Sequence, residues 1–299
     1  MTDHPEDRGK ALAMLLMGAC VIGVGPVLVR LSETGPAAAG FWRLVFALPL
    51  LAVMAQKAGG GIGKAPWTAV LAGGAFALDL GFWHYGIAYT SVAKATVLSN
   101  LTPVLVTAFA WIFLRQRPRR LFLLAVALAV AGAWTMALTK GAGSTGVNPP
   151  LGDALSAATA VWYSIYFLLV SAARQSMAAT RIMFWSTLVG APLMLLAALG
   201  LGEQVIPTGM GGWAACAGLG LMHVAGQGSI AWALGRLPAA TASVVVLVQP
   251  VVAAALGWVL FNELLGTWPA VGAAVALAGV VLAQWASRPK PADASPVSA

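Results

Sequence analysis

Long apolar stretches recur along almost the whole chain, and short polar or Gly- and Pro-rich segments separate them. A helix that crosses a bilayer needs roughly 20 mostly apolar residues. The separating segments carry residues that break helices, among them Gly35-Pro36, Pro118 and the run GAGSTGVNPP. The pattern predicts ten transmembrane helices, over residues 10–31, 37–56, 67–88, 94–114, 119–138, 151–171, 180–200, 211–233, 239–260 and 267–286.

The two halves of the chain resemble each other. Phe41 corresponds to Phe184, an offset of 143 residues, and Pro103 corresponds to Pro250, an offset of 147. One four-residue insertion, in the loop near 201–212, joins the two registers. Duplicated membrane units are typical of transporters, because two related bundles can rock about a central site. We expect a first five-helix repeat, a linker, a second five-helix repeat and a disordered tail, over residues 1–140, 141–150, 151–286 and 287–299.

Each repeat contains an odd number of predicted helices, so the two copies would enter the membrane in opposite orientations. Such an inverted repeat has a pseudo-two-fold axis in the membrane plane, and its substrate site lies near the bilayer centre between the two copies. The predicted fold class is therefore an all-α integral membrane protein. Its ten transmembrane helices form two inverted five-helix repeats around a central cavity.

The composition excludes a water-soluble domain. Hydrophobic residues make up 60% of the chain, charged residues 9%, and the mean hydropathy is +0.86, whereas a soluble domain carries about 25% charged residues. Of the 17 basic residues, 13 lie on the side that holds both termini, and the other side has only Arg30, Lys94 and Lys140. The positive-inside rule then places both termini in the cytoplasm of a bacterial inner membrane. The run RQRPRR and the net charge of +8 indicate topology rather than nucleic-acid binding.

The chain shows no pattern for a metal, cofactor or disulfide. Cys20 and Cys216 both lie in apolar segments, where we expect small buried side chains. Neither has a His or Cys at metal-binding spacing. The polar N-terminus lacks the basic start of a cleavable signal peptide, so the first apolar segment is retained as a transmembrane helix.

Few polar side chains fall within the predicted helices, and an ionisable group at membrane depth costs about 2.5–3.5 kcal/mol. Together with neighbouring aromatic residues, they are the candidates for substrate binding. The candidates are Asp79, Trp83, His84, Tyr85, Asn100, Trp162, Tyr163, Tyr166, His223, Gln227 and Gln249. Helical spacing puts His223 and Gln227 on one face, whereas His84 lies about 140° round the helix from Asp79, so these two form no obvious proton relay.

Each candidate also has a purely structural interpretation. Aromatic residues at helical spacing occur in packed cores and in interfacial belts, and a lone membrane His can bond a neighbouring helix. Asp79 is the strongest candidate for a functional charge, with a structural pairing to Arg43 or to a helix end as the alternative. Arg43 itself is expected to snorkel outward or to pair, although it could instead meet a substrate carboxylate.

Pro103 and Pro250 occupy equivalent positions in mid-helix in the two halves. Proline removes a backbone hydrogen bond and kinks a helix, which frees a carbonyl that can face a cavity. We expect a pair of hinges for the rocking motion. A fixed bend that serves only packing is the alternative.

Three longer motifs carry a resemblance to a known family. They are FWRLVFALPLL, which contains Arg43, and the two related segments YTSVAKATVLSNLTPVLVTAFAWIFLRQRP and LPAATASVVVLVQPVVAAALGWVLFNELLG. Over residues 10–286 they resemble the EamA-type members of the drug/metabolite transporter superfamily. The second copy keeps the family's acidic residue as Glu263, whereas the first copy has Gln116. The aromatic-rich sixth helix is most similar to the YddG type of amino-acid exporter, which implies export from the cytoplasm.

An aromatic-walled, mainly uncharged cavity suits small neutral or zwitterionic solutes with an apolar side chain. Together with the resemblance, this predicts a secondary transporter that exports amino acids, aromatic and other neutral ones, and related metabolites by alternating access. The alternative is an exporter of drug-like amphiphiles or of another small metabolite within the superfamily. The expected partners are a small-molecule substrate and the lipid bilayer, without nucleic acid, and a monomer is the simplest form.

Other classes of protein fit the sequence less well. An enzyme is not expected, because no nucleophile elbow and no HExxH motif occur. A channel would need a carbonyl-rich filter or charged rings. A membrane scaffold without transport would not explain the duplication.

Overall fold

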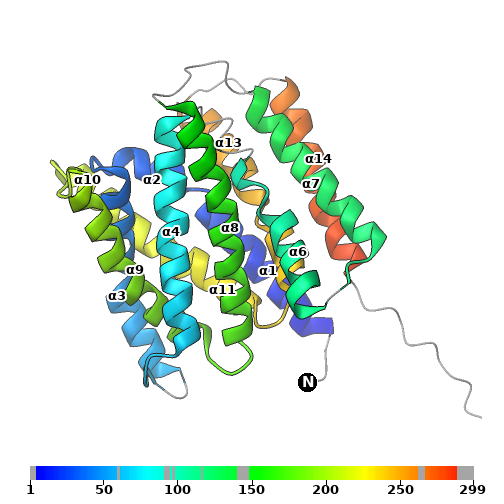
Figure 1. Cartoon of the computed structure of the whole chain (residues 1–299), viewed down its shortest axis with the longest axis horizontal. Coiled ribbons are helices and arrows are strands. Elements are labelled where there is room, and N and C mark those ends of the chain that lie inside the picture. The colour runs from blue at the N-terminus through cyan, green and yellow to red at the C-terminus, as the bar shows by residue number, and fades with distance from the viewer. Residues whose placement is uncertain are drawn as a thin grey trace, which may run out of the picture.

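The structure, a computed structural model, describes residues 5–58, 61–90, 95, 98–115, 117–139, 148–261 and 267–287 (Figure 1). Every regular element in these ranges is a helix, as the apolar pattern predicts. Some residues used in the sequence argument lie outside the described residues, namely Lys94, Gln116, Lys140, Glu263 and the tail from Arg288.

Helices lie in each of the predicted segments. In chain order they are α1 (Pro5–Ile22), α2 (Gly25–Leu31), α3 (Pro36–Lys57), α4 (Trp67–Tyr89), α6 (Thr102–Leu114), α7 (Arg120–Thr139), α8 (Pro149–Ala173), α9 (Ala179–Gly200), α10 (Met210–Met222), the π-helical turn η1 (His223–Gln227), α11 (Gly228–Ala233), α12 (Ala239–Val245), α13 (Val248–Phe261) and α14 (Thr267–Ala286). Pro36 opens α3 and Pro149 opens α8. Proline is tolerated there because the first N–H groups of a helix have no acceptor within it.

Several predicted helices are interrupted. A break at Gly23 separates α1 from α2, and η1 separates α10 from α11. The structure also corrects the predicted mid-helix position of the two prolines. Pro103 lies in the first turn of α6 and Pro250 in the first turn of α13. A two-residue turn precedes each of these helices, at 100–101 and at 246–247, so the prolines follow breaks instead of kinking continuous helices.

Four helices of the described chain are long and apolar enough to cross a membrane. They are Asp7–Leu31, which covers α1 and α2 together, Pro36–Lys57 (α3), Pro149–Ala173 (α8) and Ala179–Gly200 (α9). Shorter apolar helices cover Thr102–Phe113, Arg120–Thr135, Ala239–Ala253 and Ala270–Ala286. With several such helices and so few charges, the chain is a multi-pass integral membrane protein.

The interior is rich in small residues, and many large apolar side chains point outward. Alanines dominate the buried positions, whereas side chains such as Leu196 and Val281 are exposed. Small residues allow helix backbones to approach closely in lipid, where hydrophobicity alone does not hold helices together. Cys216 is buried as expected, but Cys20 is exposed. The prediction of burial was wrong for Cys20 because apolarity does not tell which side of a membrane helix faces its neighbours.

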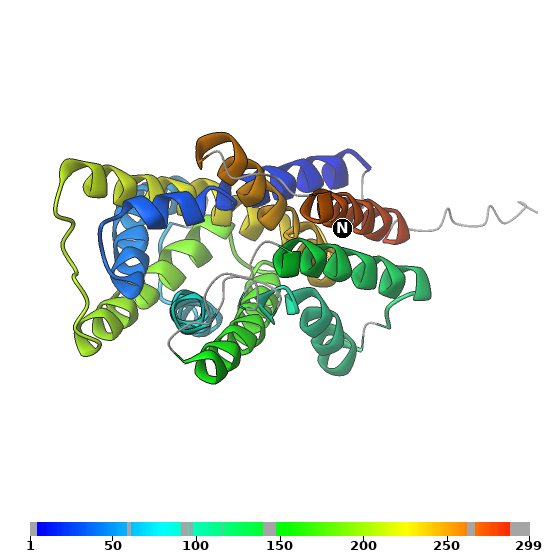
Figure 2. The same ribbon diagram turned by 90° about the horizontal axis from the view of Figure 1, so that it is seen from above.

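The helices form a central group and a flanking pair (Figures 1 and 2). In the central group, α4 packs against α8 and α9, and α3 packs against α9 and α10. The flanking pair consists of α7 and α14, which pack mainly on each other. Helices from the two halves of the sequence are therefore interleaved, and the interior surface between α3, α4, α8 and α9 is shared by both halves.

The contact between α7 and α14 is reciprocal. A Cβ placed on Gly132 of α7 would meet the backbone of Ala276, and a Cβ placed on Gly279 of α14 would meet the backbone of Ala129. Gly132 corresponds to Gly279, and Ala129 to Ala276, at the offset of 147. Because residues later in α7 meet residues earlier in α14, the two helices run antiparallel. The contact of Gly132 with Ala276 is repeated by the contact of Gly279 with Ala129, which is the pattern that a two-fold relation between α7 and α14 would give.

Glu203, in the loop after α9, caps the start of α3. Its carboxylate accepts hydrogen bonds from the N–H of Ala37 at 3.1 Å and of Ala38 at 2.9 Å. The hydroxyl of Tyr85 in α4 donates to the same carboxylate. A carboxylate is favoured at this position because the first N–H groups of a helix are unsatisfied and carry partial positive charge. A residue of the second half therefore fixes a helix of the first.

Glu33, in the loop before α3, binds the start of α10, so that a residue of the first half holds a helix of the second. It accepts hydrogen bonds from the Thr208 hydroxyl at 2.6 Å and from the Gly209 N–H at 2.8 Å. Its backbone is left-handed, with φ of 55°, a strained conformation for a residue with a side chain. Together, Glu33 and Glu203 tie the two halves to each other at one end of the bundle.

Candidate functional site

Polar groups from several helices converge on one buried aromatic ring. Phe76 of α4 lies 4.9 Å from the Tyr166 ring and 5.3 Å from the His223 ring, measured between centroids. The guanidinium carbon of Arg43 in α3 lies 5.4 Å from the Phe76 centroid. Ring contacts of this kind, and a cation over a ring face, are attractive. We call the residues gathered here the central cluster: Arg43, Phe76, Asp79, Tyr163, Tyr166, His223 and Gln227.

The central cluster contains two buried ionisable groups. Arg43 is 8% exposed and Asp79 is 7% exposed, so Arg43 does not snorkel outward. The two groups interact electrostatically, but they form no salt bridge, and within the described residues Arg43 Nε has no hydrogen-bond partner. Charges buried without direct pairing are costly in an apolar interior. A ligand that carries the complementary charges would relieve that cost.

Two tyrosines of α8 form one wall of the cluster. The rings of Tyr163 and Tyr166 are stacked, with centroids 6.0 Å apart and planes 9° apart. Both hydroxyls lie near the Gln227 side chain, and Tyr163 packs edge-on against Phe167 at 4.8 Å. Rings held on several sides present an aromatic surface with a polar rim at fixed positions. This grouping of the two tyrosines joins α8 to the π-helical turn that carries Gln227.

His223 and Gln227 come from the π-helical turn η1. The Nε2 atom of His223 lies 3.0 Å from the Thr187 hydroxyl of α9, whereas His223 Nδ1 and Gln227 Nε2 have no partner among the described residues. π-helical turns are rare and occur often at functional sites. Both side chains are buried, and the π turn that positions them leaves no signal in the apolar pattern.

The structure places the other candidates of α4 and α8 around the cluster. His84 is buried with both ring nitrogens unpartnered among the described residues, and it interacts electrostatically with Arg43. The Trp83 ring lies 5.1 Å from the His84 ring, and the half-buried Trp162 lies 6.5 Å from Phe82. These residues flank members of the cluster along α4 and α8.

Tyr85 does not join the central cluster. Its hydroxyl is engaged by Glu203 at the start of α3, and its ring stacks on Tyr89 at 6.3 Å. The sequence grouped Tyr85 with Asp79 because both lie in the same predicted helix. The loop that carries Glu203 is remote in sequence, so this contact had no local signal.

Asn100 lies in the break that precedes α6. Gln249 lies in the first turn of α13, next to Pro250. Asn100 Nδ2 and Gln249 Nε2 are buried without a hydrogen-bond partner in the described part of the chain. The Ser164 hydroxyl of α8 donates to the Thr102 carbonyl at 3.3 Å. This bond ties the start of α6 to the residue next to Tyr163, so the first break adjoins the tyrosine wall.

Within the ranges that the structure describes, most buried polar atoms that lack a partner belong to predicted site residues or to Arg43. Those atoms are Arg43 Nε, both ring nitrogens of His84, Asn100 Nδ2, His223 Nδ1, Gln227 Nε2 and Gln249 Nε2. Leaving a buried donor unsatisfied costs about 1–3 kcal/mol, and native structures rarely retain such groups without a ligand, water or function to account for them. No group of three metal-ligating side chains occurs among the described residues.

Phe76 and Thr187 contact cluster residues but were not among the predicted candidates. Arg43 was predicted to be structural, with binding of a substrate carboxylate as the alternative. Phe76 corresponds to His223 at the offset of 147, and the two rings touch. In a two-fold repeat, counterparts that contact each other lie on the axis. The internal repeat thus contained a signal for Phe76, because Phe76 is the counterpart of the candidate His223.

Comparisons with known proteins agree with this architecture. The family model of the EamA-like transporter family matches residues 9–138 and again 150–285. An uncharacterized transporter of Archaeoglobus fulgidus is 28% identical over 195 residues, covering 65% of this chain and 67% of that protein. A solved crystal structure superposes with a TM-score of 0.77 at 19% identity, covering 94% of this chain and 99% of the other. At that identity the superposition speaks for the fold alone.

Proposed function

Because this chain belongs to the EamA-like transporter family of the drug/metabolite transporter superfamily, a family of membrane transporters for small substrates, we propose that it exports amino acids. The substrates are aromatic and other neutral amino acids and related metabolites. The finer assignment, to the YddG type of exporter, rests on the aromatic residues of α8.

One observation supports this substrate class above all. A buried cation, Arg43, and a buried carboxylate, Asp79, lie unbridged beside an aromatic wall. An amino acid carries a carboxylate and an ammonium on one carbon, next to its side chain. Guanidinium binds carboxylate through paired hydrogen bonds, an acidic group binds ammonium, and stacked tyrosines accept an apolar or aromatic side chain. The central cluster offers all three in one place.

Transport would proceed by alternating access between two inverted five-helix repeats, residues 1–140 and 151–286, that together supply ten transmembrane helices. The antiparallel crossing of the corresponding helices α7 and α14 supports this arrangement. Pro103 and Pro250 follow helix breaks at equivalent positions, which suits them to act as hinges. The side rich in basic residues, with both termini, faces the cytoplasm of a bacterial inner membrane.

Counterflow in proteoliposomes tests the proposal. Vesicles loaded with unlabelled amino acid should accumulate labelled phenylalanine faster than empty vesicles. Trp162→Ala and Tyr166→Ala should weaken transport of aromatic substrates more than of small ones, because they remove aromatic surface. Trp268→Ala, which removes an exposed Trp at the start of α14, is the matched control. If no amino acid supports counterflow, the assignment is wrong and an amphiphile or other metabolite takes its place.

A further inference from the structure

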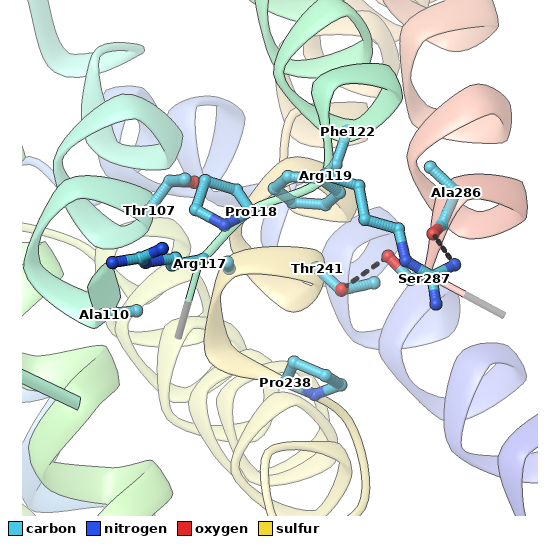
Figure 3. A pocket seen from close by; sticks show the side chains of 11 residues that line it. Thr107, Ala110, Arg117, Pro118, Arg119, Phe122, Pro238, Thr241, Ala286 and Ser287 are labelled. Atoms are coloured by element: carbon cyan, nitrogen blue, oxygen red, sulfur yellow. Dashed lines mark hydrogen bonds between the residues drawn. The ribbon is translucent and has the colours of Figure 1, made fainter. Parts of the chain in front are cut away.

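A separate cavity lies on the side that holds the N-terminus, away from Glu33 and Glu203. It has a volume of about 210 Å³. Its walls come from α6, the segment before α7, the first turn of α7, the start of α12 with the residue before it, and the end of α14 (Figure 3). The function proposed above makes no use of this cavity.

The cavity is basic and rich in hydroxyl groups. Arg117 and Arg119 flank Pro118 and extend toward opposite rims, Arg117 toward α6 and Arg119 toward α14 (Figure 3). Arg119 donates to the Ala286 carbonyl at 3.2 Å, and a hydroxyl pair, Thr241 and Ser287, is 2.9 Å apart within the lining. No acidic residue is among the described residues that line it.

Two further sources of positive charge lie close by. Arg8 of α1 donates to the Ser287 carbonyl at 2.6 Å. The N-terminal end of α7 begins directly after the two lining arginines, and a helix start carries partial positive charge and free N–H groups. An anion in the cavity would meet guanidinium groups, hydroxyls and the helix end at once, as phosphate sites in proteins do.

The surroundings of the cavity are strongly apolar. Ile112 and Phe113 at the end of α6, Leu124 in the second turn of α7 and Trp285 next to the cavity wall are all exposed. In a membrane protein such side chains contact acyl chains, and Trp is favoured where acyl chains meet headgroups. A soluble anion would use the basic cavity only. A phospholipid would use both the cavity and the apolar surface beside it.

We propose that this cavity binds the phosphate headgroup of an anionic phospholipid, with the acyl chains lying along the exposed apolar side chains of α6 and α7. Basic pockets between transmembrane helices are suited to anionic headgroups, and each nearby basic side chain contributes about a five-fold gain in affinity. Arg117 and Arg119 then serve in lipid binding as well as in setting topology.

Native mass spectrometry of the full chain in detergent, titrated with phosphatidylglycerol or with phosphatidylcholine, tests this proposal. The wild type should retain phosphatidylglycerol in preference to phosphatidylcholine. Arg117→Gln should weaken phosphatidylglycerol binding about five-fold. It removes an exposed side chain, so folding, checked by the melting temperature, is unaffected. Ala240→Leu, which fills the lining without changing charge, should weaken binding as well.

Arg120→Gln is the matched control, because Arg120 is exposed, does not line the cavity although it lies between Arg119 and Phe122, and the charge change is the same. It should leave binding almost unchanged. The proposal is overturned if Arg120→Gln weakens binding as much as Arg117→Gln, since a diffuse surface field would then account for it. It is equally overturned if inorganic phosphate at the lipid concentration displaces the bound lipid, or if Ala240→Leu has no effect.

Discussion

Replacing Glu203 should loosen the start of α3 and the tie between the two halves. Its carboxylate accepts two backbone N–H groups of α3, from Ala37 and Ala38, and the Tyr85 hydroxyl. Glu203→Ala removes all three bonds and leaves the first turn of α3 uncapped. Glu203→Gln keeps the shape and one acceptor oxygen but loses the charge. Because α3 carries Arg43, the cap also fixes one side of the central cluster.

The magnitude follows from the bonds that are lost. A hydrogen bond to a charged group contributes about 1.5–3 kcal/mol, and the loss of a helix cap costs about 0.5–2 kcal/mol. Glu203 is only partly buried, so water screens part of its charge, and bonds to one carboxylate are not additive. We expect Glu203→Ala to lower the free energy of unfolding by about 2–3 kcal/mol and Glu203→Gln by about 1 kcal/mol.

Thermal unfolding in detergent, followed by Trp fluorescence, measures the effect. At about 2–4 °C per kcal/mol, Glu203→Ala should melt about 4–12 °C below the wild type. The matched control is Gln204→Ala, because the exposed Gln204 side chain donates only to the Ile206 carbonyl at 3.2 Å. A double-mutant cycle with Tyr85→Phe should give a coupling energy of about 1 kcal/mol. A wild-type melting temperature for Glu203→Ala, or strict additivity with Tyr85→Phe, would refute the reasoning.

Three further outcomes are expected. Gly132→Ala and Gly279→Ala should each lower the free energy of unfolding by about 1–3 kcal/mol, because the new Cβ meets backbone of the opposite helix. Gly74→Ala, which meets no atom within 4 Å, should be neutral or stabilising by about 0.5–1 kcal/mol, and equal melting of all three variants would argue against the close crossing of α7 and α14. Pro103→Ala combined with Pro250→Ala should slow counterflow while the protein stays folded, whereas unchanged transport kinetics would remove the hinges. Reporter tags on the two termini should both be accessible only from the cytoplasm, and tags on opposite sides of the membrane would exclude the inverted repeat.

The helices and the repeat could be predicted because apolar length and internal similarity can both be read from the sequence. Apolar length sets where a helix crosses lipid. Matches at an offset of 143, such as Phe41 with Phe184, and at an offset of 147, such as Pro103 with Pro250, reveal the duplication. The polar residues within helices also stood out, since a bilayer interior tolerates few of them. Most of them proved to be buried, and Tyr166 and His223 both contact the Phe76 ring.

What could not be predicted depends on contacts between segments remote in sequence. The π turn at 223–227 and the helix breaks at 100–101 and 246–247 arise from packing around them, and apolar residues continue through all three. The burial of Arg43 over Phe76 depends on how α3 meets α4. The Glu203 cap depends on a loop that returns to a helix of the other half. Periodicity along one helix carries no information on any of these.

The central claim is that Arg43 binds the carboxylate of an amino-acid substrate inside the central cluster. Competition for phenylalanine counterflow by unlabelled phenylalanine and by 2-phenylethylamine, which lacks the carboxylate, tests it most directly. In the wild type, phenylalanine should compete at least about ten-fold better, since a charged hydrogen-bonded pair contributes about 1.5–3 kcal/mol. In Arg43→Gln, folded as judged by its melting temperature, that preference should disappear, and Arg43→Lys should retain part of it. A folded Arg43→Gln variant that still prefers phenylalanine to the same degree would contradict the account.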